Sequence, residues 1–409
     1  MDLFTKCKNF TRAKEIQAAG IYPYFIPIAR SRGTEVEIDG RRLLMIGSNN
    51  YLGLTHHPHV TEAAMKAVEQ YGTSPTGSRF LNGTLELHEE LEARLARFLK
   101  RESALVFSTG FQTNLGVISA LCGKDDVVII DRDDHASIVD GCRLSFAEIR
   151  KFRHNDMADL ERHLVRAQND GFQGKLIIVV GAYSMLGNLA DLPAIARLAR
   201  AYGARLLVDE AHSVGVCGAH GRGAAEALGV EKDVDLIVGT FSKSFASLGG
   251  FVAGPENVIH YIKHHARSLI FSAAIPASAA AAALAALDVL ESEPHLRTRL
   301  LRNAQKMREG LTKLGFRVGP SETAIIPVII GDQTRMFLFW KALFEGGAFT
   351  NPVTIPAVPA GMDLIRTSYM ATHTDEQLDR ALEIFETAGK RLGLIGGSAT
   401  YAATHEQAS

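Results

Sequence analysis

The sequence has little cysteine. Only Cys7, Cys122, Cys142 and Cys217 occur among 409 residues, and none of them form a CxxC pair. Neither a disulfide framework nor a zinc site is expected from this spacing. Isolated cysteines are typical of a reducing compartment.

The sequence also lacks an excess of charge and a long membrane-type hydrophobic run. The sequence has 44 Lys and Arg residues and 45 Asp and Glu residues, so its net charge is close to zero. No net positive field therefore favours the binding of nucleic acid. The longest apolar stretch, 271–290, is mostly alanine and contains Pro276 and Asp288, which indicates a buried helix. The charged N-terminus has no signal-peptide core, so we expect a cytoplasmic protein.

The length suits two or three packed domains. We expect an N-terminal arm (1–50), a large α/β domain (51–275), a smaller α+β domain (276–395) and a flexible polar tail (396–409). In the large domain, apolar runs of strand length alternate with helical segments, which predicts a mostly parallel sheet joined by βαβ crossovers. These runs are 103–108, 126–131, 175–183, 204–210 and 236–241. Ligands bind at the carboxyl ends of such strands, where the polar residues matter most.

Two of these strand ends carry a glycine and a carboxylate. Gly110 follows the first run and opens a helix whose free N–H groups suit a phosphate, although an ordinary turn is the simpler explanation of a single glycine. Asp209 ends a later strand and His212 follows it. A buried carboxylate there could hold a cationic ring nitrogen or could merely cap the next helix. No third residue at metal-ligand spacing completes a metal site.

The other two carry a lysine and a histidine. Lys243 follows a strand and lies among Thr240, Ser242 and Ser244. It is a candidate Schiff-base lysine because partial burial lowers the pKa of an amine, whereas a lone loop lysine is usually exposed. His135 follows another strand and suits either stacking on a flat cofactor or helix capping.

Together, a phosphate cradle, an aspartate, a stacking histidine and a lysine describe a pyridoxal phosphate site. Nucleotide sites are disfavoured because the sequence has neither the Gly-x-x-x-x-Gly-Lys-Ser/Thr loop nor a GxGxxG motif after a first strand. The missing GxGxxG also argues against a nicotinamide dehydrogenase.

From about residue 20 to 395, the chain resembles the α-oxoamine synthases, which are fold-type I pyridoxal phosphate enzymes. The resemblance implies an α/β transferase fold with a mostly parallel central sheet and a smaller α+β C-terminal domain. Its motifs are SNNYLGL, GTSPTGSRFLNGTLELHEELE, TGFQTN, DDHAS, YSMLGNLADL, DEAHSVG, GTFSKSFASLGG, FSAAIP and LIRTSYMATHT.

The resemblance also assigns roles by position. Lys243 matches the lysine that forms the cofactor imine and moves the proton at Cα. Asp209 matches the partner of the pyridine nitrogen, His212 the partner of the ring oxygen, and His135 the histidine stacked on the ring.

Further positions match cofactor and substrate contacts. Phosphate binding is implied for Gly110, Phe111, Thr240 and Ser242, and a position near the ring oxygen for Ser184. Ser272 matches a residue lent by a second subunit, which implies a homodimer with shared sites. Arg366 matches the arginine that binds the substrate carboxylate, and Asn50 a residue that contacts the amino acid.

Within the family, IYPYF, GTSPTGSRFLNGT, YSMLGN and the end of the chain most resemble the serine-using bacterial palmitoyltransferases. This implies condensation of L-serine with a long-chain acyl-CoA or acyl-carrier-protein thioester to 3-oxosphinganine. A long-chain product makes peripheral membrane contact plausible. A synthase that uses glycine, alanine or another small amino acid remains an alternative, as does a non-catalytic partner subunit, against which Lys243 argues.

The sequence departs from the family pattern at four positions. Phe111 stands where a tyrosine is common, so a phenol contact is missing. Gly181, Leu186 and Asn188 replace acidic residues, and their loss could alter the thioester entrance or the anchoring of the loop.

Overall fold

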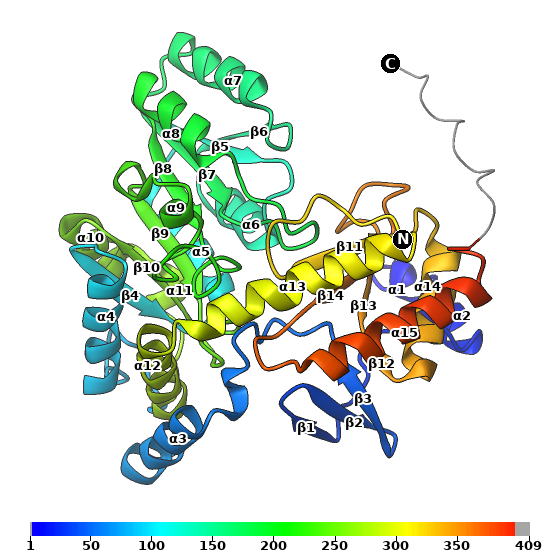
Figure 1. The fold of residues 1–409 in the computed structure, drawn as a ribbon. Coiled ribbons are helices and arrows are strands. Elements are labelled where there is room, and N and C mark those ends of the chain that lie inside the picture. Colours follow the sequence, from blue (N-terminus) through cyan, green and yellow to red (C-terminus); the bar gives the residue numbers. More distant parts are fainter. Residues whose placement is uncertain (1, 397–409) are drawn as a thin grey trace.

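Figure 1 shows the computed structural model, which describes residues 2–396. Of the predicted tail, only Gly396 lies within the described residues. A large α/β part and a smaller C-terminal part meet along the long helix α13.

A seven-stranded sheet forms the centre of the large part, in the order β4-β10-β9-β8-β7-β5-β6. Its strands are β4 (Ser103–Phe107), β5 (Asp126–Asp131), β6 (Glu148–Phe152), β7 (Gly174–Val180), β8 (Arg205–Asp209), β9 (Leu236–Thr240) and β10 (Gly250–Gly254). The pairs β5–β6, β5–β7, β7–β8 and β8–β9 are parallel, and β10 is antiparallel to β4 and β9. The inner strands are runs of buried Val, Ile and Leu because helices cover both faces.

Helices precede, connect and follow these strands in the sequence. They are η1 (Leu54–His56), α3 (Pro58–Tyr71), α4 (Glu86–Phe98), α5 (Gly110–Leu121), α6 (Ala136–Leu144), α7 (Met157–Asn169), α8 (Leu192–Ala201), α9 (Ala224–Ala227), η2 (Glu231–Asp233), α10 (Glu256–His265) and α11 (Arg267–Ile270). Side chains that accept a backbone N–H fix several helix starts, including Thr109 before α5 and Asp191 before α8. Helix α5 starts three residues after β4 ends, which places its N-terminus near that strand end.

The C-terminal part has a three-stranded antiparallel sheet in the order β11-β14-β13. Its elements are α12 (Ala277–Ser292), α13 (His295–Lys313), β11 (Ile325–Ile329), α14 (Gln333–Gly346), β12 (Ala348–Phe349), β13 (Asn351–Val353), β14 (Leu364–Ser368) and α15 (Asp375–Arg391). Helix α12 is almost entirely buried, as its alanine-rich sequence predicts. Among the described residues, no helix has the length and apolarity to cross a bilayer.

The N-terminal arm is joined to the C-terminal part. The arm consists of α1 (Thr5–Lys8), α2 (Arg12–Ala18), β1 (Arg30–Arg32), β2 (Glu35–Ile38) and β3 (Arg41–Met45). Strand β12 pairs in parallel with β3, so residues about 300 apart in sequence share one four-stranded sheet. Strands β2 and β3 form an antiparallel hairpin, and β6, β10, β12 and β13 were not predicted from the sequence.

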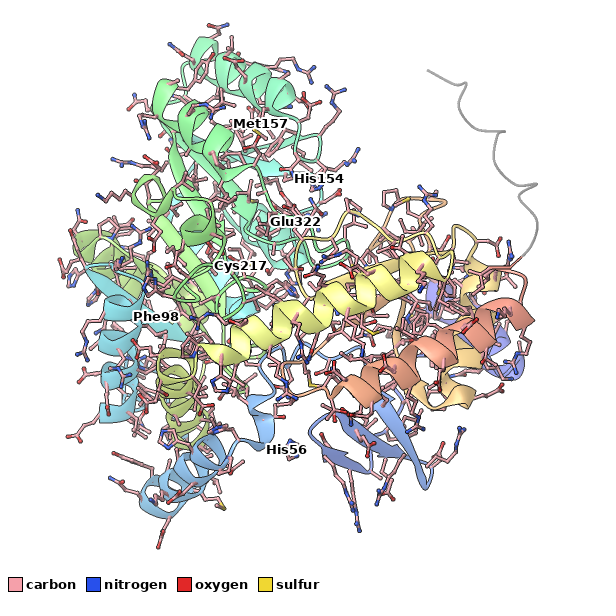
Figure 2. The ribbon with its side chains drawn as sticks, viewed as in Figure 1. His56, Phe98, His154, Met157, Cys217 and Glu322 are labelled. Carbon is pink, nitrogen blue, oxygen red and sulfur yellow. The ribbon has the colours of Figure 1, made fainter. Side chains whose placement is uncertain are left out.

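This arrangement places the carboxyl ends of β7, β8 and β9 at the junction of the two parts. His154, just after β6, and Glu322, just before β11, lie near one another at this junction (Figure 2). The junction is therefore built from residues of both parts.

Candidate active site

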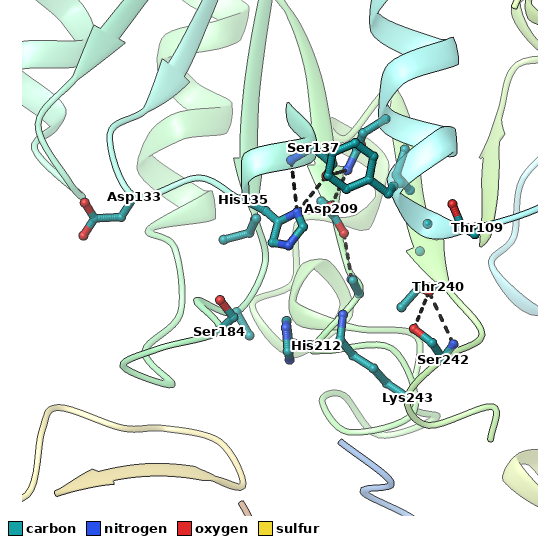
Figure 3. Close-up of a pocket in the computed structure, with 18 residues that line it drawn as sticks. Thr109, Asp133, His135, Ser137, Ser184, Asp209, His212, Thr240, Ser242 and Lys243 are labelled. Carbon is teal, nitrogen blue, oxygen red and sulfur yellow. Dashed lines mark hydrogen bonds between the residues drawn. The ribbon is translucent and has the colours of Figure 1, made fainter. Parts of the chain in front are cut away.

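A cavity of about 260 Å³ lies at the carboxyl ends of the central strands. Figure 3 shows side chains from several of these ends directed into it. Nine predicted site residues line it: Gly110, Phe111, His135, Ser184, Asp209, His212, Thr240, Ser242 and Lys243. The structure thus brings together residues spread over more than 130 positions of the sequence.

One end of the cavity is suited to a phosphate. Helix α5 begins at Gly110, and the first N–H groups of a helix have no partner within it. Thr240 and Ser242 face this helix start, with their hydroxyl oxygens 2.9 Å apart. A Cβ at Gly110 would lie 2.8 Å from the Cβ of Thr240, so only glycine allows this close approach. N–H groups, a helix dipole and hydroxyls form a cradle for a dianion.

Asp209 ends β8 as a buried carboxylate with fixed orientation. Its Oδ2 accepts a hydrogen bond from Asn114 Nδ2 at 2.8 Å, and its Oδ1 accepts one from the backbone N–H of Ala211 at 2.9 Å. Asn114 is itself fully buried and also donates to Ser137 Oγ. A carboxylate held this way can stabilise a cationic ring nitrogen, because it cannot turn away to solvent.

Lys243 projects into the cavity close to Asp209 (Figure 3). Burial lowers the pKa of its amine to about 8, although the Asp209 carboxylate opposes this shift and Arg366 reinforces it. A substantial fraction of the amine is therefore neutral near neutral pH, as a nucleophile for an aldehyde must be.

Two histidines flank the lysine. Burial, followed by the charges of Lys243 and Arg366, lowers the pKa of His212 well below its ordinary value, so His212 is neutral. Burial also lowers the pKa of His135. The backbone N–H of Ser137 donates to His135 Nδ1, which assigns the ring proton to Nε2. His135 caps α6 and also presents its ring to the cavity, so both of its predicted roles are compatible.

Three predicted residues lie outside the cavity lining. Arg366 is buried on β14, where its Nε donates to the carbonyl oxygen of Ser184 at 2.6 Å. Asn50 is buried and donates to Thr55 Oγ1. Ser272 accepts a hydrogen bond from Gln112 near the start of α5. The role of Ser272 at a partner's site stays a prediction.

Several residues of the site were not predicted from the sequence. Tyr51 is fully buried, and its hydroxyl lies 2.7 Å from His212 Nδ1 and 3.4 Å from an Arg366 nitrogen. Asn49 accepts a hydrogen bond from Arg366 at 2.9 Å. Tyr51 and Asn49 flank the predicted Asn50, and Asn114 lies one helical turn after Gly110. All three lie within the family motifs SNNYLGL and TGFQTN, but the resemblance assigned no role at these positions.

The family model for class I and II aminotransferases matches residues 41–385. The chain belongs to this aminotransferase family. Serine palmitoyltransferase from Sphingobacterium spiritivorum is 48% identical over 93% of this chain and 95% of its own length. The 8-amino-7-oxononanoate synthase from Geobacter metallireducens is 44% identical over 95% of this chain and all of its own length.

The solved structures of this aminotransferase family include serine palmitoyltransferase from S. paucimobilis with a bound PLP–myriocin aldimine. It matches with a TM-score of 0.94 and 40% identity over 97% of this chain and all of its own. The predicted α-oxoamine synthase relationship, the fold and the pyridoxal phosphate cofactor are confirmed. The individual site residues remain predictions, which the cavity geometry supports.

Proposed function

We propose that this protein condenses L-serine with a long-chain acyl thioester to give 3-oxosphinganine. The thioester is either palmitoyl-CoA or the corresponding thioester of acyl-carrier protein. A bond forms between the serine Cα and the acyl carbon, the thiol leaves, the serine carboxyl group leaves as CO₂, and one proton is taken up. The single observation that carries the proposal is the cavity with Lys243 beside Asp209, in a chain 48% identical to a serine palmitoyltransferase.

The residues present fit the cofactor. When bound, pyridoxal phosphate supplies an electron sink that stabilises negative charge at the amino-acid Cα. Asp209 would hold the proton on the pyridine nitrogen, and its two hydrogen bonds keep it in place. The start of α5 with Thr240 would bind the phosphate.

Lys243 would move the proton at Cα. A group works best as acid and base when its pKa lies near the working pH, and burial brings the pKa of the Lys243 amine to about 8. The same amine can therefore accept a proton from Cα and return it. The ring of His135 would stack on one face of the cofactor ring.

Arg366 would bind the serine carboxylate. Its guanidinium is oriented by Ser184 O, Asn49 Oδ1 and the Tyr51 hydroxyl. A planar guanidinium oriented by these hydrogen bonds can donate its remaining N–H groups to a carboxylate.

A homodimer with shared sites is part of the proposal. Phe80, Leu81 and Phe271 are 54%, 79% and 74% exposed, and Phe271 adjoins Ser272. A dimer interface would cover these apolar side chains. Light scattering should give twice the 44.3 kDa chain mass, whereas a monomer would contradict shared sites.

Peripheral membrane contact is proposed through the arm. Leu3, Phe4 and Phe10 are each more than 60% exposed and lie beside Lys6 and Lys8. Apolar and cationic side chains together suit an anionic lipid surface. The protein should float with phosphatidylglycerol vesicles, and the Lys6→Glu/Lys8→Glu double variant should not. Flotation of the double variant equal to that of wild type would contradict the arm's role.

The activity test uses carboxyl-¹³C-labelled L-serine with palmitoyl-CoA. We expect ¹³CO₂ and 3-oxosphinganine in equal amounts, and neither product from Lys243→Ala. Parallel reactions with alanine and pimeloyl-CoA test the 8-amino-7-oxononanoate synthase alternative, which the 44% identical relative favours. A preference for that pair would overturn the serine assignment, and inactivity with every pair would favour a non-catalytic subunit.

A further inference from the structure

Residues 183–190 form a tight loop between β7 and α8. The N–H of Gly187 donates to the carbonyl of Tyr183 at 2.8 Å, and the N–H of Tyr183 donates to the carbonyl of Asn188 at 2.9 Å. Gly187 has a φ of +73°, which favours glycine. These two hydrogen bonds and the turn at Gly187 hold the loop in a compact shape.

This 183–190 loop orients Arg366 through a backbone atom. The carbonyl oxygen of Ser184 accepts the hydrogen bond from Arg366 Nε at 2.6 Å. No side-chain substitution at position 184 removes a carbonyl group. Whatever fixes the loop therefore fixes this edge of the guanidinium.

On the large-domain side, His154 holds the loop. Its Nδ1 lies 3.1 Å from Asp131 Oδ1, and its Nε2 lies 3.0 Å from the side-chain nitrogen of Asn188. The ring also packs edge-on against Tyr183 at 4.3 Å between centroids. His154 is not among the residues that line the cavity.

On the other side, the segment before β11 holds the same loop. Glu322 Oε1 accepts the N–H of Leu189 at 3.0 Å, and the N–H of Glu322 donates to the carbonyl of Gly187 at 3.0 Å. Figure 2 shows Glu322 and His154 at this junction. The loop thus joins both parts of the molecule beside the proposed carboxylate site.

We propose that His154 is a positioning residue for the substrate carboxylate: through Asn188 it fixes the 183–190 loop, and the loop fixes Arg366. The inference rests on the proposed role of Arg366. It assigns His154 no contact with substrate or cofactor.

The charges around His154 favour its cationic form. Burial disfavours the imidazolium, but the hydrogen bond and charge of Asp131 and the charge of Asp133 outweigh burial, and Arg132 opposes them only in part. The pKa of His154 is therefore raised. The cation is present below this pKa and is lost as pH rises through it.

The Asn188 amide can serve either form of the ring. As placed, its nitrogen faces His154, and its buried Oδ1 has no hydrogen-bond partner within residues 2–396. Amide nitrogen and oxygen have nearly the same shape, and a half-turn would let Oδ1 accept the Nε2–H of the imidazolium. A charge-assisted bond then anchors the loop at low pH, and a weaker neutral bond anchors it at high pH.

The first test compares His154→Phe with His163→Phe. His163 is a matched control because it is also half-buried and near an aspartate, Asp159, but it does not touch the loop. Binding of L-serine to the cofactor-loaded protein is measured by spectral titration without thioester.

We expect serine to bind His154→Phe about tenfold more weakly, the effect of one lost hydrogen bond to a charged group. The cofactor affinity and kcat should stay within about twofold of wild type, and His163→Phe should match wild type throughout. Unchanged serine affinity in His154→Phe would overturn the proposal, as would a parallel loss of cofactor affinity.

The second test uses Asn188→Asp, which adds a carboxylate facing His154. NMR of ¹³C-labelled histidine should show a higher pKa for His154, with its resonance assigned by its absence in His154→Phe. Serine affinity should fall as His154 loses its proton, so in Asn188→Asp this fall should occur at a higher pH than in wild type. A raised His154 pKa with an unmoved affinity profile would contradict the proposal.

These tests separate the inference from the proposed function. If the wild type binds glycine or alanine better than serine, the serine assignment fails. The same variants are then compared with that amino acid, because its carboxylate is the same. Loss of affinity in His154→Phe for whichever amino acid binds supports the positioning role.

Discussion

The lowered pKa of Lys243 predicts how the cofactor-free protein captures pyridoxal phosphate. Only the neutral amine attacks the aldehyde. An ordinary lysine, with a pKa of 10.5, is neutral to about one part in a thousand at about pH 7.5, whereas a pKa of about 8 leaves about a quarter neutral. We therefore expect capture about 200-fold faster, per lysine, than an exposed lysine allows.

The assay follows capture by absorbance between about pH 6 and 10. Free Nα-acetyl-lysine, measured in parallel, corrects for ionisation of the cofactor itself. The corrected rate should rise with pH and level off just above about 8. A rate that keeps rising toward 10.5 would refute the lowered pKa.

Asp209→Asn sharpens this prediction. The Asp209 carboxylate raises the pKa of Lys243 against the effect of burial, so its removal should move the plateau to lower pH. Capture at neutral pH should then be as fast or faster, while condensation falls on the order of 100-fold or more because the ring nitrogen loses its partner. An unchanged or higher inflection would show that Asp209 does not act on the lysine.

Three further changes test the frame of the site. Arg79→Met should lower the free energy of unfolding in urea by about 3–5 kcal/mol, because Arg79 pairs with Glu92 in the interior. The Arg79→Met/Glu92→Met double variant should lose less of this free energy, because no unpaired charge remains buried. Equal losses in the single and double variants would contradict a buried pair. Asn114→Ala removes a donor to the cavity carboxylate and should weaken cofactor binding about tenfold by fluorescence titration; unchanged binding would contradict this role. Gly110→Ala should weaken cofactor binding by a similar factor, because its methyl group would lie 2.8 Å from a neighbouring Cβ; wild-type affinity would show that the helix start can shift freely.

Local sequence pattern predicted the parallel strands well. The buried runs that became β5, β7, β8 and β9 need no alternation, because helices cover both of their faces. Asp209 and Thr240 end two of them, so the parallel arrangement alone placed them together at one edge. Lys243 was predicted at the same edge because it follows the end of β9, at Thr240, by three residues.

Strands without such a run were missed. β10, with the sequence GFVAG, is short and glycine-bounded, and it is a strand because it fits antiparallel between β4 and β9. β6, with the sequence EIRKF, carries three charged residues in five positions. Their pairing partners, which local propensity does not encode, stabilise both strands.

The contacts that complete the site are long-range. Tyr51 meets His212 across 161 positions, and Arg366 meets Asn49 across 317. No spacing rule connects such residues, and only the packing of the arm and the C-terminal part against the large sheet brings them together. The resemblance to a family supplied Arg366, but not the tyrosine and asparagine that orient it.

Reduction of the cofactor-loaded protein with borohydride, followed by peptide mass mapping, tests the central claim most directly. We predict one pyridoxyl group per chain, attached to the Nζ of Lys243. A label on any other lysine, or no label in fully loaded protein, would contradict the account of the site.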